Sequence, residues 1–381
     1  MRAHRLGYID SVRGLILVLM ALDHASVFWN RGRVASEGLP VYERGTLAFV
    51  AERTDSLAQR ATRFVTHVCA PGFIFLAGMM VAFSSARGDR DERSRRSLSA
   101  HLWARGAVFV VLEITFIRLI WGYNQLLWPA VGNGSGAPLG FGIISLFGLL
   151  FMAMALGRRA PMWPVLGCCV AIPAAYWAIL PSLAIWTYEA PTRLLLDVAP
   201  ALYLPVGAGT HGISTGLYPL VPWIPVMGAG LVYGRWLAGR HERGQAADAK
   251  KLLLVVGGCL VALFLLLHDG LGERFSKYPP SPGFLAVTVG ALCLVLGLAQ
   301  FLEEKGISLG LLQTYGKAPF FFYVAHLLLY SLVPSLSGKC GHFSLPTTYA
   351  AWLAGLAILY FPCRWYYDVR QSHKESLLKY L

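Results

Sequence analysis

Apolar segments long enough to cross a lipid bilayer recur along almost the whole of this 381-residue chain. A membrane-spanning helix needs about 20 mostly apolar residues. Because a bilayer interior cannot satisfy open backbone groups, a chain with many such segments must fold as a bundle of helices. The sequence therefore predicts an all-α polytopic membrane protein of about ten transmembrane helices. We place them at residues 9–30, 67–86, 103–122, 139–156, 162–182, 215–237, 252–268, 284–302, 313–334 and 346–363.

The amino-acid composition also indicates a membrane protein. Hydrophobic residues make up 56% of the sequence and charged residues only 14%, which is too apolar for a soluble protein of this length. The first apolar segment runs on into aromatic residues without the small-residue cleavage site of a signal peptide, so we expect it to be retained. We find no internal repeat and no soluble module. A single transmembrane domain is expected over residues 1–381.

The basic residues, which give a net charge of +13, are dispersed between the apolar segments. A nucleic-acid-binding protein would gather them on one soluble surface, so we expect no nucleic-acid partner. Short cytoplasmic loops of membrane proteins carry an excess of Lys and Arg. Both termini are therefore expected in the cytoplasm, on the side of the basic connectors at residues 86–96, 157–159, 234–251 and 363–375.

Two longer connectors are expected on the opposite, outer side. Residues 31–65 show amphipathic helical periodicity after Gly45, which predicts a segment lying along the membrane surface. Residues 183–214 are rich in Pro and Gly and are expected to be irregular.

The familiar ligand-binding and catalytic motifs are missing from the sequence. There is no HExxH sequence, no Cys/His cluster at metal-ligand spacing and no glycine-rich phosphate loop. Most cysteines lie inside apolar segments, so no disulfide framework is suggested. We expect neither a metal site nor a permanently bound cofactor.

Ionisable residues inside the predicted spans are the first candidates for function, because a charge at mid-membrane costs about 2.5 to 3.5 kcal/mol on insertion scales. Arg13 and His24 are eleven residues apart, or three helical turns plus about 20°, so they share one helix face about 16 Å apart. Asp10 lies one turn before Arg13 and can pair with it. Asp23 points about 100° away from His24. In the alternative interpretation Arg13 only anchors the helix and His24 only hydrogen-bonds a neighbouring span.

His67 stands at the outer entrance of the second predicted span, at the depth expected for His24. Histidine suits proton transfer at neutral pH. Two imidazoles at one depth beside Asp23 therefore predict an acid/base centre. The alternative is that His67 is an interfacial residue that caps the second span.

Two further spans contain ionisable residues. Glu113 and Arg118 are five residues apart at mid-depth of the third span, where a structural ion pair is the favoured interpretation. His326 is a lone histidine on an apolar face of the ninth span, and a packing contact and catalysis both remain open. We include Glu113 and His326 among the candidate substrate-binding residues.

Proline-rich stretches are expected to shape the binding cavity. Lys277 and Tyr278 precede two prolines in the outer loop 276–284, and a rigid polar loop suits substrate binding, although a tight turn explains the pattern equally well. Residues 218–234 contain three prolines and three glycines, which predicts a kinked and closely packed helix.

An ordered set of motifs gives the chain a family likeness. The stretches are IDSVRGLILVLMALDH, RFVTHVCAPGFIFLAG, YPLVPWIPVMGAG, KYPPSPGF and GKAPFFFYVAH. Together they resemble the bacterial proteins that share the catalytic domain of heparan-α-glucosaminide N-acetyltransferase, within the wider group of membrane acyltransferases that modify carbohydrates. Any one stretch is a weak signal, whereas the set in this order is specific.

The resemblance implies an acyl-CoA-dependent acyltransferase of the bacterial inner membrane. In the wider group an Arg and a His separated by ten residues in the first span are essential, and Arg13 and His24 match them. Acetyl-CoA or another acyl-CoA is the implied co-substrate, and a glycan or other small polar molecule is the implied acceptor. The chemistry falls to His24 or His67, oriented by Asp23. Arg13, Arg87, Arg105 and Lys317 are the candidate ligands of the CoA phosphates, although the same cations serve as topology signals.

Other function classes remain open on the sequence alone. A proton-coupled small-molecule transporter would also place Asp, Glu and His inside its spans, but no pair of related halves is visible. A non-catalytic partner of an envelope assembly system is a third class. The lipid bilayer is an expected partner. The sequence leaves the oligomeric state open, with a homodimer among the alternatives.

Overall fold

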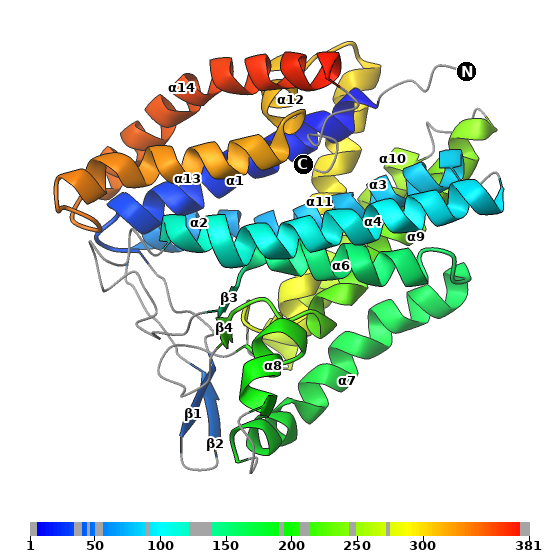
Figure 1. Cartoon of the computed structure of the whole chain (residues 1–381), viewed down its shortest axis with the longest axis horizontal. Coiled ribbons are helices and arrows are strands. Elements are labelled where there is room, and N and C mark those ends of the chain that lie inside the picture. Colours follow the sequence, from blue (N-terminus) through cyan, green and yellow to red (C-terminus); the bar gives the residue numbers. More distant parts are fainter. Residues whose placement is uncertain are drawn as a thin grey trace.

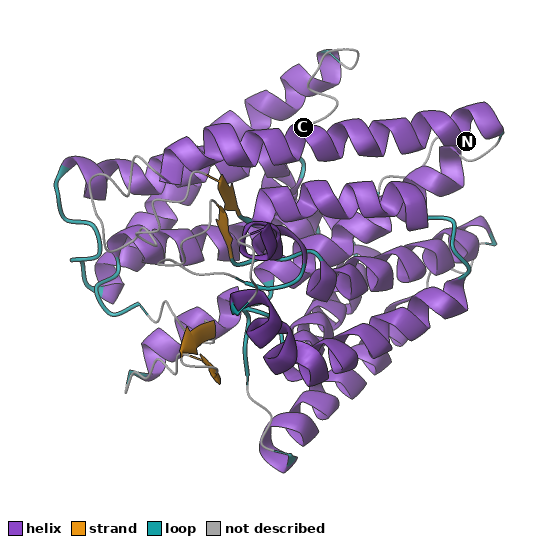
Figure 2. Cartoon of the chain, turned by 60° about the horizontal axis from the view of Figure 1, so that its bottom comes forward, coloured by secondary structure: helices purple, strands orange, loops and turns teal. Residues whose placement is uncertain are grey.

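Helices dominate the computed structural model (Figure 2), which describes residues 6–33, 40–43, 46–49, 56–88, 91–121, 139–189, 194–205, 214–243, 249–271 and 275–373. The helices up to the middle of the chain are α1 (Gly7–Trp29), α2 (Leu57–Thr66), α3 (Cys69–Gly88), α4 (Glu92–Leu112), the π-helix η1 (Glu113–Ile117), α6 (Ile143–Gly157), α7 (Met162–Tyr188) and α8 (Leu194–Leu202). The later ones are the 3₁₀ turn η2 (Val221–Trp223), α9 (Ile224–Glu242), α10 (Ala249–Leu265), the π-helix η4 (Leu266–Gly270), α11 (Pro282–Glu304), α12 (Gly310–Gly316), α13 (Pro319–Leu336) and α14 (Leu345–Ser372).

Strands are confined to two short pairs within the described residues. β1 (Pro40–Glu43) and β2 (Thr46–Phe49) form an antiparallel pair, and β3 (Leu139–Phe141) pairs in parallel with β4 (Ser214–Gly216). The amphipathic helix expected after Gly45 is found as α2, at Leu57–Thr66, whereas residues 46–49 form a strand instead of helix. The second pair joins two connectors that are distant in the sequence.

The long helices lie side by side as a bundle (Figure 1), with α1 at its centre, in contact with α3, α11, α12, α13 and α14. We call the end at which α1 begins the proximal end and the end at which it finishes the distal end. The connection between α13 and α14 contacts the distal end of α1. There the Gly341 N–H donates to the Phe28 carbonyl, and the Phe343 N–H donates to the Trp29 carbonyl, both at 2.8 Å.

The outer helices present apolar side chains to the surroundings. In the most apolar windows of α7 and α10–η4, only 22% and 11% of residues are buried inside the protein. Large side chains such as Trp163 and Val255 are 79% and 63% exposed. Six of the described helical segments are long and apolar enough to cross a membrane, and α6 is a shorter apolar helix. The prediction of an all-α polytopic membrane protein is confirmed.

Several element boundaries differ from those expected. The ninth expected span is divided into α12 and α13, since Pro319 stands in the first turn of α13 and cannot continue a preceding helix. The third begins eleven residues early, at Glu92, where the Asp91 side chain accepts the Ser94 N–H at 2.7 Å as an N-cap. The connector 183–214, expected to be irregular, contains α8 and the end of α7.

The glycine-rich helix α9 packs closely on α3, as its composition predicts. A Cβ added at Gly230 would lie 2.0 Å from the Phe75 carbonyl oxygen, and one added at Gly78 would lie 2.1 Å from the Met227 carbonyl oxygen. No side chain fits in either place. Two helices cross at this point with their backbones in contact, the arrangement that small residues permit in membranes.

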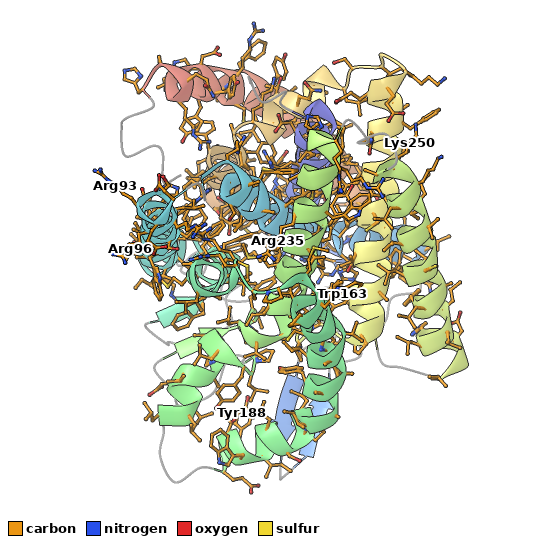
Figure 3. The ribbon with its side chains drawn as sticks, turned by 90° about the vertical axis from the view of Figure 1, so that its right-hand side faces the viewer. Arg93, Arg96, Trp163, Tyr188, Arg235 and Lys250 are labelled. Carbon is orange, nitrogen blue, oxygen red and sulfur yellow. The ribbon has the colours of Figure 1, made fainter. Side chains whose placement is uncertain are left out.

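Basic side chains mark the proximal end of the bundle. Figure 3 looks along the bundle from this end and shows Arg93 and Arg96 projecting from the first turns of α4. Deeper in, the Arg235 guanidinium donates to the carbonyls of Arg158 and Ala160, so it joins α9 to the turn after α6. Lys250 pairs with Glu304 between α10 and α11.

Candidate active site

His24 on α1 meets His326 on α13 in the distal half of the bundle. Nδ1 of His24 and Nε2 of His326 lie 2.6 Å apart, and the rings stack with centroids 4.9 Å apart. Nδ1 of His326 also lies 2.8 Å from the Phe322 carbonyl oxygen. His326 is fully buried, whereas His24 retains some exposed surface. The group that touches the His24 ring therefore comes from a position 302 residues further along the chain.

Aromatic side chains surround this imidazole pair. Trp121 and Tyr323 approach the His24 ring edge-on, with centroids 5.9 and 6.3 Å away. Phe322 stacks on His326 at 5.4 Å. Such a setting excludes bulk water, which strengthens any hydrogen bond made inside it.

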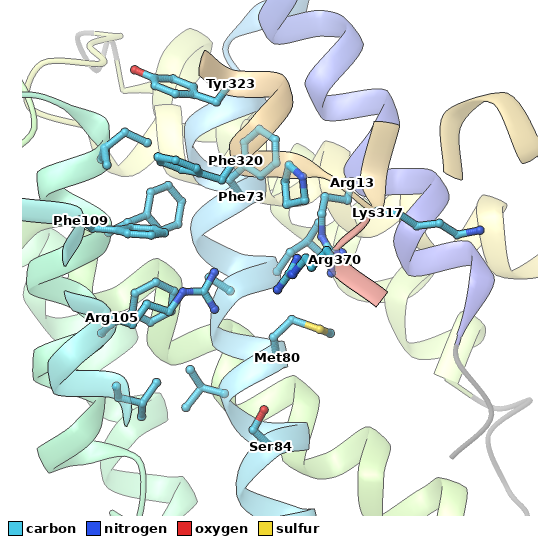
Figure 4. A pocket seen from close by; sticks show the side chains of 18 of the residues that line it. Arg13, Phe73, Met80, Ser84, Arg105, Phe109, Lys317, Phe320, Tyr323 and Arg370 are labelled. Atoms are coloured by element: carbon cyan, nitrogen blue, oxygen red, sulfur yellow. The ribbon is translucent and has the colours of Figure 1, made fainter. Parts of the chain in front are cut away.

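A cavity of about 620 Å³ extends along α1 on the proximal side of His24. Figure 4 shows the side chains that line it. Arg13, Leu17 and Met20 line it from α1, and His24 follows at the next position of the same helical stripe. Tyr323 closes the end of the cavity nearest His24 and also contacts that ring. The remaining wall is largely apolar, and its aromatic side chains include Phe73, Phe109, Phe147, Phe151 and Phe320.

Three guanidinium groups converge in the proximal part of the cavity, from α1, α4 and α14 (Figure 4). Arg13 donates to the Asp10 carboxylate at 3.1 Å and to the Gly316 carbonyl at 3.0 Å. Arg105 lies over the rings of Phe109 and Phe151, at 5.2 and 4.9 Å, and the charges of Arg13 and Arg370 act on it. The described residues that line the cavity include no Asp or Glu. Guanidinium groups gathered at one place of a cavity are suited to a polyanion such as phosphate.

The other predicted CoA ligands lie differently. Lys317 lines the cavity, but its ammonium points away from the three arginines (Figure 4) and lies 5.5 Å from the Tyr367 ring. Arg87 is exposed at the end of α3 and is not among the described residues that line the cavity.

Asp23 has partners of its own at the distal end of α1. Its carboxylate accepts hydrogen bonds from Arg33 at 2.9 Å, Arg63 at 3.0 Å and Thr66 at 3.2 Å. The Arg63 side chain is only 5% exposed, so the two guanidinium groups hold a largely desolvated carboxylate. Asp23 is engaged by these arginines, and the place beside Nδ1 of His24 is occupied by His326.

His67 lies at the junction of α2 and α3, where it is 3% exposed. Its ring packs against Phe275 and Phe284, with centroids 5.5 and 5.4 Å away. The structure thus brings His24 together with His326 and places the His67 ring in an aromatic cluster next to α11.

Lys277 and Tyr278 form a buried polar cluster in the loop before α11. The Lys277 ammonium lies 5.1 Å from the Tyr278 ring and 5.9 Å from the Tyr218 ring, and the two tyrosine hydroxyls are 3.1 Å apart. Burial raises the pKa of Tyr278, but the nearby charges of Lys277 and Arg63 outweigh it, so the pKa lies below its ordinary value. Lys277 also acts electrostatically on Asp23 and His24.

Glu113 caps another helix. Its carboxylate accepts the backbone N–H groups of Ile144 and Ser145 at 2.8 and 3.1 Å, at the N-terminus of α6. Arg118, expected to form an ion pair with it, acts on this carboxylate through space. The π-helical turn η1 begins at Glu113, and α6 supplies Ile143, Ile144 and Phe147 to the cavity wall.

The sequence analysis missed several cavity residues, among them Arg370 and Tyr323. Arg370 was included in an expected cytoplasmic tail at 363–375, but α14 continues to Ser372 and brings this side chain to the cavity. Tyr323 lies one turn before His326 and was treated as part of an apolar span. A helical periodicity continued past residue 363 is the signal that would have found Arg370.

Comparison with known proteins identifies the family. The family profile described as an acyltransferase domain matches residues 6–364, and the chain belongs to this family of membrane acyltransferases. A comparison with curated proteins finds no match.

Proposed function

We propose that this protein moves an acyl group, most simply acetyl, from cytoplasmic acyl-CoA to a carbohydrate hydroxyl or amine at the outer face, with His24 as the catalytic base. One observation carries the proposal: the cavity follows the face of α1 from Arg13 to the turn before His24. A donor entering at the basic end would therefore have its reactive end directed toward the imidazole. Family membership favours this activity over the transporter and assembly-partner alternatives.

The basic end of the cavity would hold the donor. Arg13, Arg105 and Arg370 would bind the CoA phosphates, because planar guanidinium groups match phosphate oxygens in bidentate pairs. Lys317 would add positive charge at the entrance, and the exposed Arg87 would attract the donor from the cytoplasm. The aromatic wall beyond the arginines suits the apolar part of the pantetheine arm and the acyl group.

In the chemical step the imidazole of His24 would act as the general base. The acceptor O–H or N–H attacks the thioester carbonyl carbon, and a ring nitrogen of His24 takes its proton. The carbon–sulfur bond then breaks, and the departing CoA thiolate takes that proton from His24. The Tyr323 hydroxyl, at the end of the cavity opposite the arginines (Figure 4), would donate to the oxyanion that forms in between. An acyl-histidine intermediate is the variant of this route in which His24 attacks first.

The acceptor would reach the imidazole from the distal side. Lys277 and Tyr278 lie in the loop before α11, and Lys277 acts electrostatically on Asp23 and His24, so the two are the candidate acceptor ligands. Asp23 and His67 would support this side of the site, and Glu113 would contribute through the α6 terminus that it caps.

Within the family, the ordered motifs support membership of the bacterial heparan-α-glucosaminide N-acetyltransferase-like group. We assign the whole of residues 1–381 to one domain, with both termini in the cytoplasm, in a bacterial inner membrane. The required partners are the bilayer, acyl-CoA and a glycan or other small polar acceptor, with a homodimer as one candidate assembly.

The direct test uses acetyl-CoA labelled in the acetyl group. Membranes that contain the wild-type protein should transfer label to an extracted envelope glycan. His24→Gln should reduce this transfer at least about 100-fold, because it removes the general base. Label retained on the protein when acceptor is omitted would indicate the acyl-histidine route.

His241→Gln is the matched control, since His241 lies exposed at the end of α9 and should leave transfer unchanged. Full transfer by His24→Gln at wild-type membrane levels would contradict the role of His24. Uptake of a solute by vesicles that contain the purified protein without acyl-CoA, together with no label transfer, would favour the carrier instead.

A further inference from the structure

We propose that His326 is a positioning residue that holds His24 in the Nδ1–H tautomer and so makes Nε2 the basic nitrogen of the site. This inference rests on the proposed function for its catalytic consequence, but the tautomer itself can be measured without any turnover. His326, first considered as a substrate ligand, has no exposed surface and therefore acts through His24.

The direction of both hydrogen bonds can be worked out from the Phe322 carbonyl, which is the last group in the series His24, His326, Phe322. Nδ1 of His326 lies 2.8 Å from the Phe322 carbonyl oxygen, which can only accept. That nitrogen must therefore carry a proton, because two lone pairs would otherwise face each other. In a neutral imidazole the other nitrogen, Nε2, is then an acceptor.

The contact between His326 and His24 then determines which nitrogen of His24 carries the proton. Nε2 of His326 lies 2.6 Å from Nδ1 of His24, so Nδ1 of His24 must donate. In a neutral His24, Nε2 is then left without a proton, as a general base requires. His24 thus donates to His326, and His326 donates to the Phe322 carbonyl.

The alternative would require a charged His326. With protons on both nitrogens, His326 could donate to Phe322 and to His24 at once. Among the described residues, His24 is the ionisable group that acts electrostatically on His326, and no carboxylate pairs with it. A fully buried imidazolium in such surroundings would lack a counter-ion, which is costly in free energy.

The helix geometry explains why His326 can perform this task. Phe322 lies four residues before His326, so the Nδ1 contact is made within one turn of α13 and holds the ring. On the other side, α1 and α13 are fixed by the Trp29 indole N–H, which donates to the Tyr330 carbonyl at 2.9 Å. The imidazole pair is thus supported by two packed helices, as a preorganised site requires.

The first experiment is solid-state NMR on protein labelled with ¹⁵N at histidine, in lipid bilayers at neutral pH, without donor or acceptor. Protonated and unprotonated ring nitrogens have well-separated shifts, and His24→Gln and His326→Gln assign the two residues by the signals that disappear. We expect both His24 and His326 with Nδ1 protonated and Nε2 bare. A His24 ring with Nε2 protonated and Nδ1 bare, or a doubly protonated His326, would overturn the proposal.

The second experiment compares two substitutions of His326. Gln places an amide oxygen near the position of Nε2 and can accept from His24, whereas Phe fills the space without an acceptor. His326→Phe should lose the fixed tautomer of His24 and reduce kcat at least about tenfold, with KM for acetyl-CoA unchanged. His326→Gln should restore both the His24 signals and most of kcat.

Equal kcat values for His326→Phe and wild type would refute the positioning role. All variants, including the two that assign the NMR signals, are compared only after size-exclusion chromatography shows the wild-type elution profile. If the tautomer is found but His24→Gln transfers label normally, the proposed function of His24 fails while the structural inference stands.

Discussion

At the residue scale, the ionisable side chains of this bundle are held in local arrangements that compensate for their burial. The Asp23 carboxylate has two guanidinium partners, the Glu113 carboxylate has two backbone N–H donors, and His24 has His326. The cavity arginines differ in part, because Arg13 pairs with Asp10 while the like charges of Arg13 and Arg370 both act on Arg105. An arrangement that is unfavourable without a ligand indicates a site built for an anion.

Arg370 offers a test of this site at the residue scale. Arg370→Gln should raise KM for acetyl-CoA about tenfold, because a charge-assisted contact to phosphate contributes about 1.5 kcal/mol or more. KM for acetyl-pantetheine, which lacks the nucleotide phosphates, should stay unchanged. Both values come from the rate of thiol release.

The matched variant for this test is Arg364→Gln. Arg364 lies on the same helix but is exposed, and it is not among the described residues that line the cavity. The role of Arg370 fails if both variants raise KM equally, or if the two donors respond equally to Arg370→Gln.

At the element scale, α1 fixes the positions of the site residues because other helices pack against nearly every face of it. Its contacts with α12, α13 and α14 position Arg13 and His24, and the Trp352 indole N–H of α14 donates to the Val18 carbonyl at 3.0 Å. The α3–α9 pair supports the opposite side of the cavity, where α3 contributes Phe73, Leu76 and Met80.

The α3–α9 crossing predicts a large effect of a small substitution. Gly230→Val places a side chain where the Phe75 carbonyl oxygen lies 2.0 Å from the first added carbon. We expect a loss of about 3 kcal/mol in the free energy of unfolding, because a backbone contact cannot yield as a side chain can. Thermal unfolding of the detergent-purified protein measures the change.

Gly258→Ala provides the comparison, since a Cβ at Gly258 on α10 would meet nothing within 4 Å. This variant should unfold at or slightly above the wild-type temperature, because Ala favours helix over Gly. Equal melting temperatures for Gly230→Val and wild type would show that the two backbones are further apart than described.

At the scale of the whole molecule, the bundle has two chemically different ends connected by the aromatic cavity. Basic residues gather at the proximal end, whereas the Asp23 and Lys277 clusters lie beyond the imidazole pair. This polarity suits a protein that takes its donor from one side of a membrane and its acceptor from the other.

The orientation of the bundle can be tested with cysteines introduced into a background without native cysteines. Arg96→Cys lies at the proximal end on α4 and Lys339→Cys at the distal end in the α13–α14 connection, and both parent residues are exposed. In intact cells an impermeant maleimide should label Lys339→Cys at once and Arg96→Cys only after permeabilisation. The reverse pattern would place the termini outside and exclude cytoplasmic acyl-CoA as the donor at this cavity.

The sequence by itself determined the fold class and the candidate residues of the first helix. Runs of about 20 apolar residues leave helices as the only structure a bilayer accepts, and a period of 3.6 places Arg13 and His24 on one face. The small residues of α9 likewise predicted close packing. These properties are local, because each depends on one segment and its surroundings.

Tertiary structure decided which side chains meet. The partner of His24 comes from α13, Asp23 is paired with Arg33 and Arg63, and Arg370 reaches the cavity only because α14 continues past its expected end. Contacts between distant helices depend on how each helix is rotated and shifted against its neighbours. That choice is made by packing over the whole bundle, so no single stretch of sequence contains it.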